Sequence, residues 1–274
     1  MITFQGATVT QGTVLNAEAT GGLGEIHILH PPGTFALTPA SRISIQAIGR
    51  HQHLLAGNGI DWGSGTGCLA ITAAKIATVK RVLGLEISSA NVEMARQNAI
   101  LNGVKDKVEF LLSDSYTPFA EADHKSLETF VGRTSFILAN PPSSEGDDGF
   151  GYRRLVICGA RKYLVKGGLI FLSISYQYGQ QRVERLSQQI PGFIYGGILS
   201  STDWVSFDLQ RPDLFHCLEL YAEEERRNGL KYVFLNPEVP NTYMDAQAAL
   251  VCFRRIGLSP LTKWQTHLFR YVGE

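Results

Sequence analysis

The pattern of apolar and polar residues differs between two regions of the chain. The first fifty residues are mixed: a hairpin-like stretch at 8–29, with glycines at 21–24, leads to a proline-rich segment at 30–39. From residue 54 onward, short apolar runs typical of strands alternate with helical patterns. The strand-like runs cover residues 59–61, 82–86, 108–112, 136–139 and 169–174.

The segments between these runs carry start and stop signals of helices. They cover residues 69–77, 88–102 and 152–165, and glycines follow the second and third of them. Strands that alternate with helices of this length predict a parallel sheet covered on both faces. We therefore predict an α/β fold with a doubly wound, mostly parallel, seven-stranded Rossmann-like sheet. Ligands of such sheets bind beyond the carboxyl ends of the strands.

The last third of the chain departs from a simple alternation. We find no internal repeat, low-complexity tract or linker in the sequence. We interpret residues 1–50 as an N-terminal cap or hairpin region and 51–274 as one domain with an insertion at about 208–262. The elements expected in this third are a helix at 180–189, a β-like stretch at 193–207, helices at 212–228 and 244–256, and a closing edge strand at 264–272.

The amino-acid composition disfavours some classes of binding partner but does not identify the function. The 274 residues are 44% hydrophobic, and Lys plus Arg (25) balance Asp plus Glu (25), so no global field attracts nucleic acid or an anionic membrane. The start of the chain lacks the features of a signal peptide, and no apolar run approaches the ~18 residues of a membrane span. The histidines form no metal-ligand pattern. We expect a cytoplasmic protein whose separated cysteines are buried thiols: Cys68, Cys158, Cys217 and Cys252.

A glycine-rich segment, Asp61-Trp62-Gly63-Ser64-Gly65-Thr66-Gly67, follows an apolar strand and opens a helix. Closely spaced glycines let the backbone turn sharply and approach a ligand. A tight turn without a ligand is one alternative, and a dinucleotide fingerprint is another, because residues 65–70 fit the GxGxxG/A template. A carboxylate at the strand end disfavours the second alternative, since it repels a pyrophosphate and attracts a cation.

This segment resembles the DxGxGxG first motif of class I S-adenosylmethionine (SAM)-dependent methyltransferases. The resemblance implies that Glu86 accepts hydrogen bonds from both ribose hydroxyls, as a carboxylate with two acceptor oxygens can. It also implies that Asp114 meets the adenine amino group, for which a solvated loop acid is the alternative. The implied cofactor-binding set comprises Asp61, Gly63, Ser64, Gly65, Gly67, Glu86, Ile87, Asp114, Ser115 and Asn140.

A second motif, Asn140-Pro141-Pro142-Ser143, follows another apolar strand, so we expect it at the same crevice. Consecutive prolines fix the backbone and keep its carbonyls out of helical hydrogen bonds. The motif resembles the NPPY motif of N-methyltransferases, which modify adenine amino groups, glutamine side-chain amides and some small substrates. The resemblance implies that Asn140 and the Pro141 carbonyl align the target nitrogen, and that all four residues form the catalytic set. A plain Asn-Pro-Pro turn is the alternative.

Ser143 departs from the motif, whose fourth residue is aromatic. A planar acceptor normally stacks on that ring, and a hydroxyl does not replace it. Either Phe150 or Tyr152 supplies a ring, or the acceptor is not planar. The acidic and aromatic segment 144–152 is either a loop for a cationic acceptor or a solvated loop, and residues 35–42 resemble the stretch that covers the cofactor in related methyltransferases.

Three functions remain open. The first is methyl transfer from SAM, by direct in-line displacement, to a nitrogen of a small molecule or a protein side chain. The second is methylation of an RNA or DNA base, which neutral composition and Ser143 disfavour. The third is a non-catalytic SAM-binding interaction domain. The sequence specifies neither the acceptor nor the oligomeric state.

Geometry at the crevice distinguishes the first two functions. A small acceptor predicts a pocket closed by the insertion, with aromatic side chains such as Phe215, Tyr221 and Tyr243 near Asn140. A nucleic-acid acceptor predicts an open crevice. Its rim would carry the basic side chains Arg153, Arg154, Arg161 and Lys162.

Overall fold

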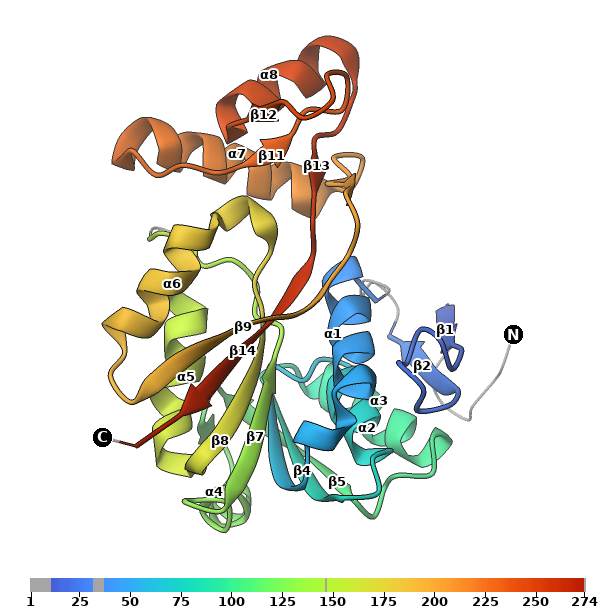
Figure 1. Ribbon diagram of the computed structural model, residues 1–274. Coiled ribbons are helices and arrows are strands. Elements are labelled where there is room, and N and C mark those ends of the chain that lie inside the picture. Colours follow the sequence, from blue (N-terminus) through green and yellow to red (C-terminus); the bar gives the residue numbers. More distant parts are fainter. Residues whose placement is uncertain (1–10, 32–36, 146, 274) are drawn as a thin grey trace.

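The computed structural model describes residues 11–31, 37–145 and 147–273. Its main sheet has the strand order β6-β5-β4-β3-β7-β8-β14-β9 (Figure 1). The five strands from β5 to β8 are parallel, and β14 runs antiparallel to β8 and β9. The strands are β3 (Gly57–Trp62), β4 (Val79–Glu86), β5 (Val108–Asp114), β6 (Thr117–Pro118), β7 (Thr134–Ala139), β8 (Leu164–Ser173), β9 (Phe193–Ser201) and β14 (Gln265–Tyr271).

The predicted fold class is confirmed. The sheet has one strand more than predicted, because the two-residue β6 pairs with the end of β5. The prediction of a closing edge strand at 264–272 is wrong, since β14 lies between β8 and β9. Its polar side chains suggest an edge but are buried and hydrogen-bonded: Thr266 contacts Ser44 at 3.0 Å, and His267 Nε2 lies 3.0 Å from the Ile174 carbonyl.

Helices cover both faces of the sheet (Figure 1). The burial of β7 explains why its sequence is apolar from Phe136 to Ala139. Phe136 and Leu138 pack into one core cluster, whereas Ile137 and Ala139 pack into the other. A strand buried on both faces has no polar side, in contrast to a half-exposed strand. The first cluster contains α1 (Pro39–Arg50), α2 (Cys68–Ala74) and α3 (Ser89–Leu101), and the second α4 (Glu121–Glu128), α5 (Gly151–Tyr163) and α6 (Gln180–Gln189).

The N-terminal region forms a separate antiparallel hairpin of β1 (Gln11–Leu15) and β2 (Ile26–His30). Two asparagines of the α3 region attach it to the body. Asn98 accepts from the Leu29 N–H at 2.9 Å and donates to its carbonyl at 3.0 Å, and Asn102 does the same for His27 at 3.0 and 2.7 Å. Residues 35 and 36 of the predicted cofactor-covering stretch lie outside the described residues.

The predicted insertion forms a lobe beyond the carboxyl ends of the parallel strands (Figure 1). A second, four-stranded sheet accompanies its two helices. The buried Glu225 carboxylate fixes their packing, because it accepts hydrogen bonds from the N–H groups of Tyr232 (2.8 Å), Ala246 (3.0 Å) and Gln247 (3.0 Å). The elements are α7 (Pro212–Asn228), α8 (Ala246–Ile256), β10 (Val205–Ser206), β11 (Phe234–Leu235), β12 (Tyr243–Met244) and β13 (Leu261–Thr262).

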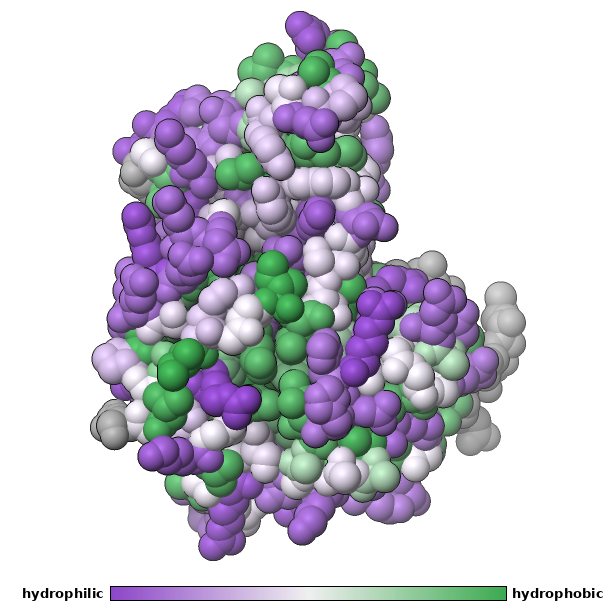
Figure 2. Space-filling model, in the orientation of Figure 1, coloured by the Kyte–Doolittle hydropathy of each residue, from purple (hydrophilic) through white to green (hydrophobic). Residues whose placement is uncertain are grey.

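The edge strand β9 carries exposed apolar side chains. Ile194 and Ile198 are 57% and 45% exposed, and Figure 2 shows hydrophobic residues gathered in the middle of this face of the body. Two register shifts interrupt the pairing of β9 with β14. Such bulges are one way in which proteins blunt a sheet edge against pairing with another chain.

The prediction of four buried thiols is wrong for Cys158, which is exposed, and only Cys68 is fully buried. Cys158 lies between Ile157 and Ala160, two of the buried positions of the amphipathic α5, and its own side chain faces outward. No group of three potential metal ligands occurs among the described residues. Within the same residues, no helix has the length and apolar character to cross a bilayer.

Candidate active site

The glycine segment turns the chain from β3 into α2. Gly63, Gly65 and Gly67 have φ values of 67°, 55° and 84°, a region that favours glycine. A Cβ at Gly67 would lie 2.7 Å from the Phe110 ring, so this glycine is required by packing. A Cβ at Gly63 or Gly65 would meet no atom within 4 Å. The backbone at these two glycines therefore faces open space where a ligand can approach.

Asp61 ends β3 beneath this segment and is only 1% exposed. Its Oδ2 accepts hydrogen bonds from Ser64 Oγ (2.9 Å) and the Ala70 N–H (3.0 Å), whereas its Oδ1 has no partner among the described residues. Burial raises the pKa of this carboxyl to about 7. An unsatisfied buried oxygen is unusual in a folded protein, and a cationic ligand group would satisfy it.

Glu86, at the end of β4, is buried and holds the glycine segment. Its Oε2 accepts from the Gly65 N–H at 2.7 Å, and its Oε1 accepts from the Ser88 N–H at 2.8 Å. Oε1 also accepts a weaker hydrogen bond of 3.4 Å from Asn91 Nδ2, so it is Oε2 that retains capacity for a further hydrogen bond. The neighbouring Ile87 side chain is 63% exposed. The contact with Gly65 is a structural role that the sequence motif alone does not reveal.

The end of β5 lies beside the end of β4. The Asp114 side chain is exposed, and its carboxylate has no hydrogen-bond partner among the described residues. Ser115 has a positive φ of 55°, and its hydroxyl accepts a hydrogen bond of 2.9 Å from Trp62 Nε1. This bond joins the ends of β3 and β5. The strand order thus brings three predicted acids to neighbouring strand ends: Asp61, Glu86 and Asp114.

Asn140 follows the last residue of β7. Its Nδ2 donates to Ser41 Oγ at 3.2 Å, and its Oδ1 has no partner in the described part of the chain. The Pro141 carbonyl accepts a weak hydrogen bond of 3.4 Å from Arg153 Nη2. The hydroxyl of Ser143 reaches only the neighbouring Ser144 carbonyl, at 3.5 Å. The tetrapeptide therefore presents two acceptors with remaining capacity, and Ser143 has no evident polar role.

A cavity of about 290 Å³ lies beside the tetrapeptide. Its far side is formed by α7, and four aromatic rings line it. The hydroxyls of two of them, Tyr178 and Tyr221, lie 3.0 Å apart. The lining includes the tetrapeptide, Arg153 and the rings of Tyr178, Phe207, Tyr221 and Trp264.

Of the aromatic residues predicted from the insertion, Tyr221 lines this cavity. Phe215 instead packs on Phe253, with ring centroids 5.8 Å apart, and Tyr243 is 55% exposed. The two rings that could stand in for the motif's aromatic residue, Phe150 and Tyr152, do not line this cavity. Phe150 is buried against Tyr178, and Tyr152 lies 6.3 Å from the Trp62 ring.

Three of the cavity rings were not predicted: Tyr178, Phe207 and Trp264. They come from segments that are distant in sequence and belong to no motif. Phe207 and Trp264 flank the predicted insertion, and their rings stack with centroids 5.9 Å apart. An aromatic residue at each boundary of an insertion is the signal that would have indicated them.

The four basic residues proposed as a rim do not surround Asn140. Arg154 pairs with Asp148, Lys162 pairs with Glu128, and Arg161 donates to the Pro191 carbonyl. Of these four, only Arg153 lines the cavity, as a buried side chain. The other cation of the cavity lining, Arg211, pairs with Asp213 at 2.8 Å. The described lining therefore contains one buried and one ion-paired cation, and not the open basic rim expected for a nucleic-acid acceptor.

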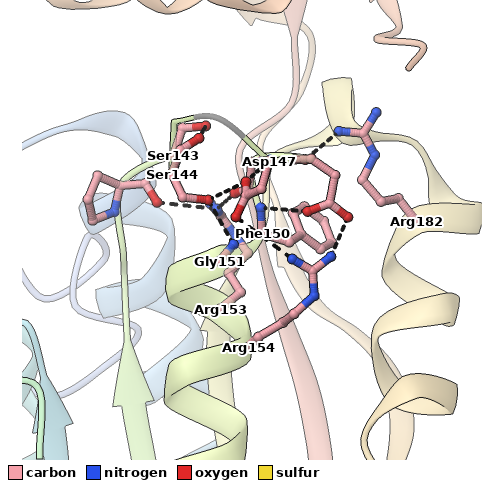
Figure 3. Close-up of polar contacts among 11 residues, drawn as sticks. Ser143, Ser144, Asp147, Phe150, Gly151, Arg153, Arg154 and Arg182 are labelled. Carbon is pink, nitrogen blue, oxygen red and sulfur yellow. Dashed lines mark hydrogen bonds and ion pairs between the residues drawn. The ribbon is translucent and has the colours of Figure 1, made fainter. Parts of the chain in front are cut away.

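The acidic loop after the tetrapeptide is folded on itself (Figure 3). Asp147 Oδ1 accepts from Ser144 Oγ at 2.7 Å and from the Gly149 N–H at 2.6 Å. Burial acts to raise the pKa of Asp148, but its hydrogen bond and ion pair with Arg154 outweigh burial and hold that pKa below its usual value. The two aspartates thus have partners within the loop and its surroundings.

The family model of the methyltransferase small domain matches residues 25–191. The chain belongs to this family. Membership confirms the predicted enzyme class and its methyl donor, SAM. The catalytic and cofactor-binding roles of individual residues stay predictions.

Relatives of this methyltransferase include a release factor glutamine methyltransferase of Thermodesulfovibrio yellowstonii, 28% identical over 186 residues, which covers 59% of this chain and 62% of the relative. A ribosomal protein L11 methyltransferase of Tolumonas auensis is 39% identical over 64 residues, or 23% of this chain and 22% of the relative. Among solved structures, the tRNA m1G37 methyltransferase of M. jannaschii is similar, with 10% identity, a TM-score of 0.49 and coverage of 91% and 52%. The chain spans less than two thirds of these curated relatives.

The site of this methyltransferase fits SAM in three respects. The open backbone at Gly63 and Gly65 leaves space for a ligand, and the unpaired oxygen of Asp61 suits the ammonium group of SAM. The carboxylates of Glu86 and Asp114 retain acceptor capacity for ribose and adenine donors.

Proposed function

We propose that this enzyme transfers a methyl group from SAM to a nitrogen of a small molecule or a protein side chain that enters the cavity beside Asn140. One observation carries the proposal: the cavity is bounded by the Asn140-Pro141-Pro142-Ser143 tetrapeptide and by α7 of the insertion. A cavity of about 290 Å³ suits a side-chain-sized group. The absence of a basic rim in the described crevice disfavours a nucleic-acid acceptor.

The chemistry needs orientation rather than a covalent intermediate. When bound, SAM supplies an electrophilic methyl group on its sulfonium sulfur. The Asn140 amide oxygen and the Pro141 carbonyl accept hydrogen bonds from the acceptor nitrogen and so direct its lone pair. The nitrogen gains positive charge as its bond to the methyl carbon forms and the carbon–sulfur bond breaks, and the two oxygens stabilise that charge. The nitrogen then releases a proton to solvent.

Two of the relatives support a protein acceptor, because their names describe enzymes that act on release factor glutamine and on ribosomal protein L11. The aromatic lining supports a planar amide or amine. The rings of Tyr178, Tyr221 and Trp264 supply apolar surface that Ser143 lacks. We infer that these rings, one from the insertion, one beside its end and one from the turn after β8, replace the aromatic residue of the motif.

The test begins with calorimetric binding of SAM. The protein is then incubated with methyl-labelled SAM and separate pools of amines, amide-containing peptides and oligonucleotides, and products are identified by mass. We expect label in the amine or amide pool, and at least about a hundredfold less with Asn140→Ala. Label on oligonucleotides alone would contradict the proposal. SAM binding without any labelled product would favour a non-catalytic domain.

A further inference from the structure

Arg153, in the first turn of α5, is a buried cation without a carboxylate partner among the described residues. It is 4% exposed. Its guanidinium donates only to backbone carbonyls: Nη1 to Gly149 (2.8 Å) and Pro142 (3.3 Å), Nη2 to Pro141 (3.4 Å), and Nε to Ser173 (3.3 Å). A buried charge is costly unless its donors are satisfied, and here three chain segments accept four hydrogen bonds from its five N–H groups.

Two aromatic rings fix the plane of this guanidinium. Its Cζ lies 5.3 Å from the ring centroid of Phe150 and 4.9 Å from that of Tyr178. Cation–π contacts of this length are favourable, more so when solvent is excluded. The planar donor fork of arginine then points in fixed directions, which a lysine ammonium does not reproduce. Figure 3 shows Arg153 together with the loop that follows the tetrapeptide.

We propose that Arg153 is a positioning residue that holds the Pro141 and Pro142 carbonyls, and through them Asn140, at the depth required for the acceptor nitrogen. This inference rests on the proposed function. A carbonyl oxygen has two lone pairs, so Pro141 can bond to Arg153 and still accept from the substrate. A misplacement of about 1 Å costs on the order of a hundredfold in rate.

Arg182 provides a matched control. Its Cζ lies over the same rings, 5.9 Å from the centroid of Phe150 and 5.5 Å from that of Tyr178. It donates to the Asp148 carbonyl at 2.8 Å, in the same loop, but makes no hydrogen bond to the tetrapeptide. Arg153→Met and Arg182→Met therefore both remove aromatic stacking and a loop contact, and only the first removes the contacts to Pro141 and Pro142.

The kinetic test measures kcat and KM with the acceptor found in the pool assay, and SAM affinity by calorimetry. We expect Arg153→Met to lower kcat about 30- to 100-fold, with SAM affinity within about threefold of the parent. Arg182→Met should keep kcat within about threefold. Arg153→Lys, which keeps the charge but loses the planar fork, should recover only part of kcat.

A second test needs no acceptor, so it separates failure of this inference from failure of the proposed function. Protein containing isotope-labelled asparagine gives side-chain amide NMR signals, and Asn140→Asp assigns that of Asn140. We expect Arg153→Met to shift or broaden the Asn140 signal and Arg182→Met to leave it in place. If the methionine variant does not fold, the same NMR measurement is made on Arg153→Lys.

An unchanged Asn140 signal in the Arg153 variants would overturn the proposal, as would equal losses of kcat in the Arg153 and Arg182 variants. Full recovery of kcat by Arg153→Lys would also overturn it, because charge alone would then suffice.

Discussion

The proposed cofactor half and the proposed acceptor half of the site are assembled in different ways. Asp61, the glycines and Glu86 lie within 26 residues, at the ends of two adjacent parallel strands. Asp61 bonds to Ser64 and Glu86 bonds to Gly65, both within the glycine segment. The acceptor cavity combines the tetrapeptide with rings from positions 178, 207, 221 and 264. The first half depends on local turns of the chain. The second depends on how a separate lobe packs on the sheet, so the two should respond differently to substitution.

The largest expected effect separates catalysis from cofactor binding. Asn140→Ala should lower turnover about a hundredfold or more, because the acceptor nitrogen loses its orienting oxygen, and should leave SAM affinity within a few fold. Steady-state kinetics and calorimetry measure the two quantities. Asn58→Ala, on the same sheet at the start of β3, is the control and should change neither. Equal losses of SAM binding and turnover would show that Asn140 belongs to the cofactor half.

The next effect belongs to the cofactor half. Glu86→Ala should weaken SAM binding by about 1.5–3 kcal/mol, since charge-assisted hydrogen bonds to ribose are lost along with the bond that anchors Gly65. Asp114→Ala should weaken it in the same direction. Glu109→Ala removes a half-exposed carboxylate of β5, paired with Arg81, and serves as the control. Calorimetry measures the affinity of each variant for SAM. An unchanged affinity in Glu86→Ala would mean that this carboxylate does not contact SAM.

A pH dependence should also be confined to the cofactor half. Because burial raises the pKa of Asp61 from 3.8 to about 7, the carboxyl is neutral below that pH and ionised above it. SAM affinity should therefore be full above pH 7 and fall by up to about tenfold per unit as pH drops below it. The unliganded protein should show the opposite trend, losing stability as pH rises from 3.8 towards 7, because over this range the unfolded chain ionises the carboxyl while the folded state keeps it protonated.

Asp61→Asn is the matched variant for this dependence, since it keeps the shape of the side chain without its charge. Its SAM affinity should be low. Between about pH 5 and about pH 8 the affinity should change by no more than the error of the calorimetric measurement. A variant that retained the slope of the parent would assign the titration to another group.

The smallest effect belongs to the acceptor half. Tyr221→Phe removes the hydroxyl that lies 3.0 Å from the hydroxyl of Tyr178 and should lower the free energy of unfolding by about 0.5–1.5 kcal/mol. The KM for the acceptor should rise a few fold while SAM affinity stays constant. Thermal melting and kinetics check both. A change in SAM affinity instead would show that the two halves are not independent.

The same contrast explains what could be predicted from the sequence. The glycine motif and Glu86 were accessible because neighbouring residues create both the turn and its contacts. Helix α7 was predicted at its observed bounds, since Pro212 starts it and Gly229 follows it in the left-handed conformation. Helix α4 was missed, because Leu127 is its only buried residue and no apolar stripe marks it.

Tertiary packing determined the rest. The position of β14 between β8 and β9 depends on pairing with strands more than sixty residues earlier in the chain. Its buried polar residues make its sequence resemble that of an edge strand. The cavity rings have no shared sequence spacing. Arg153 looked like a surface cation on a basic helix, and only the fold shows that three chain segments enclose it.

The neck of the insertion has a consequence for how acceptor choice can change. The chain enters and leaves the lobe at adjacent points: Val205 pairs with Thr262, and the Phe207 N–H donates to the Pro260 carbonyl at 2.8 Å. A segment with neighbouring ends can be exchanged for one of different length without altering the strands that carry Asp61 and Glu86. Chimeras joined at this neck should therefore inherit donor use from the body and acceptor selectivity from the lobe, which makes the neck a natural junction for redirecting the enzyme to a new substrate.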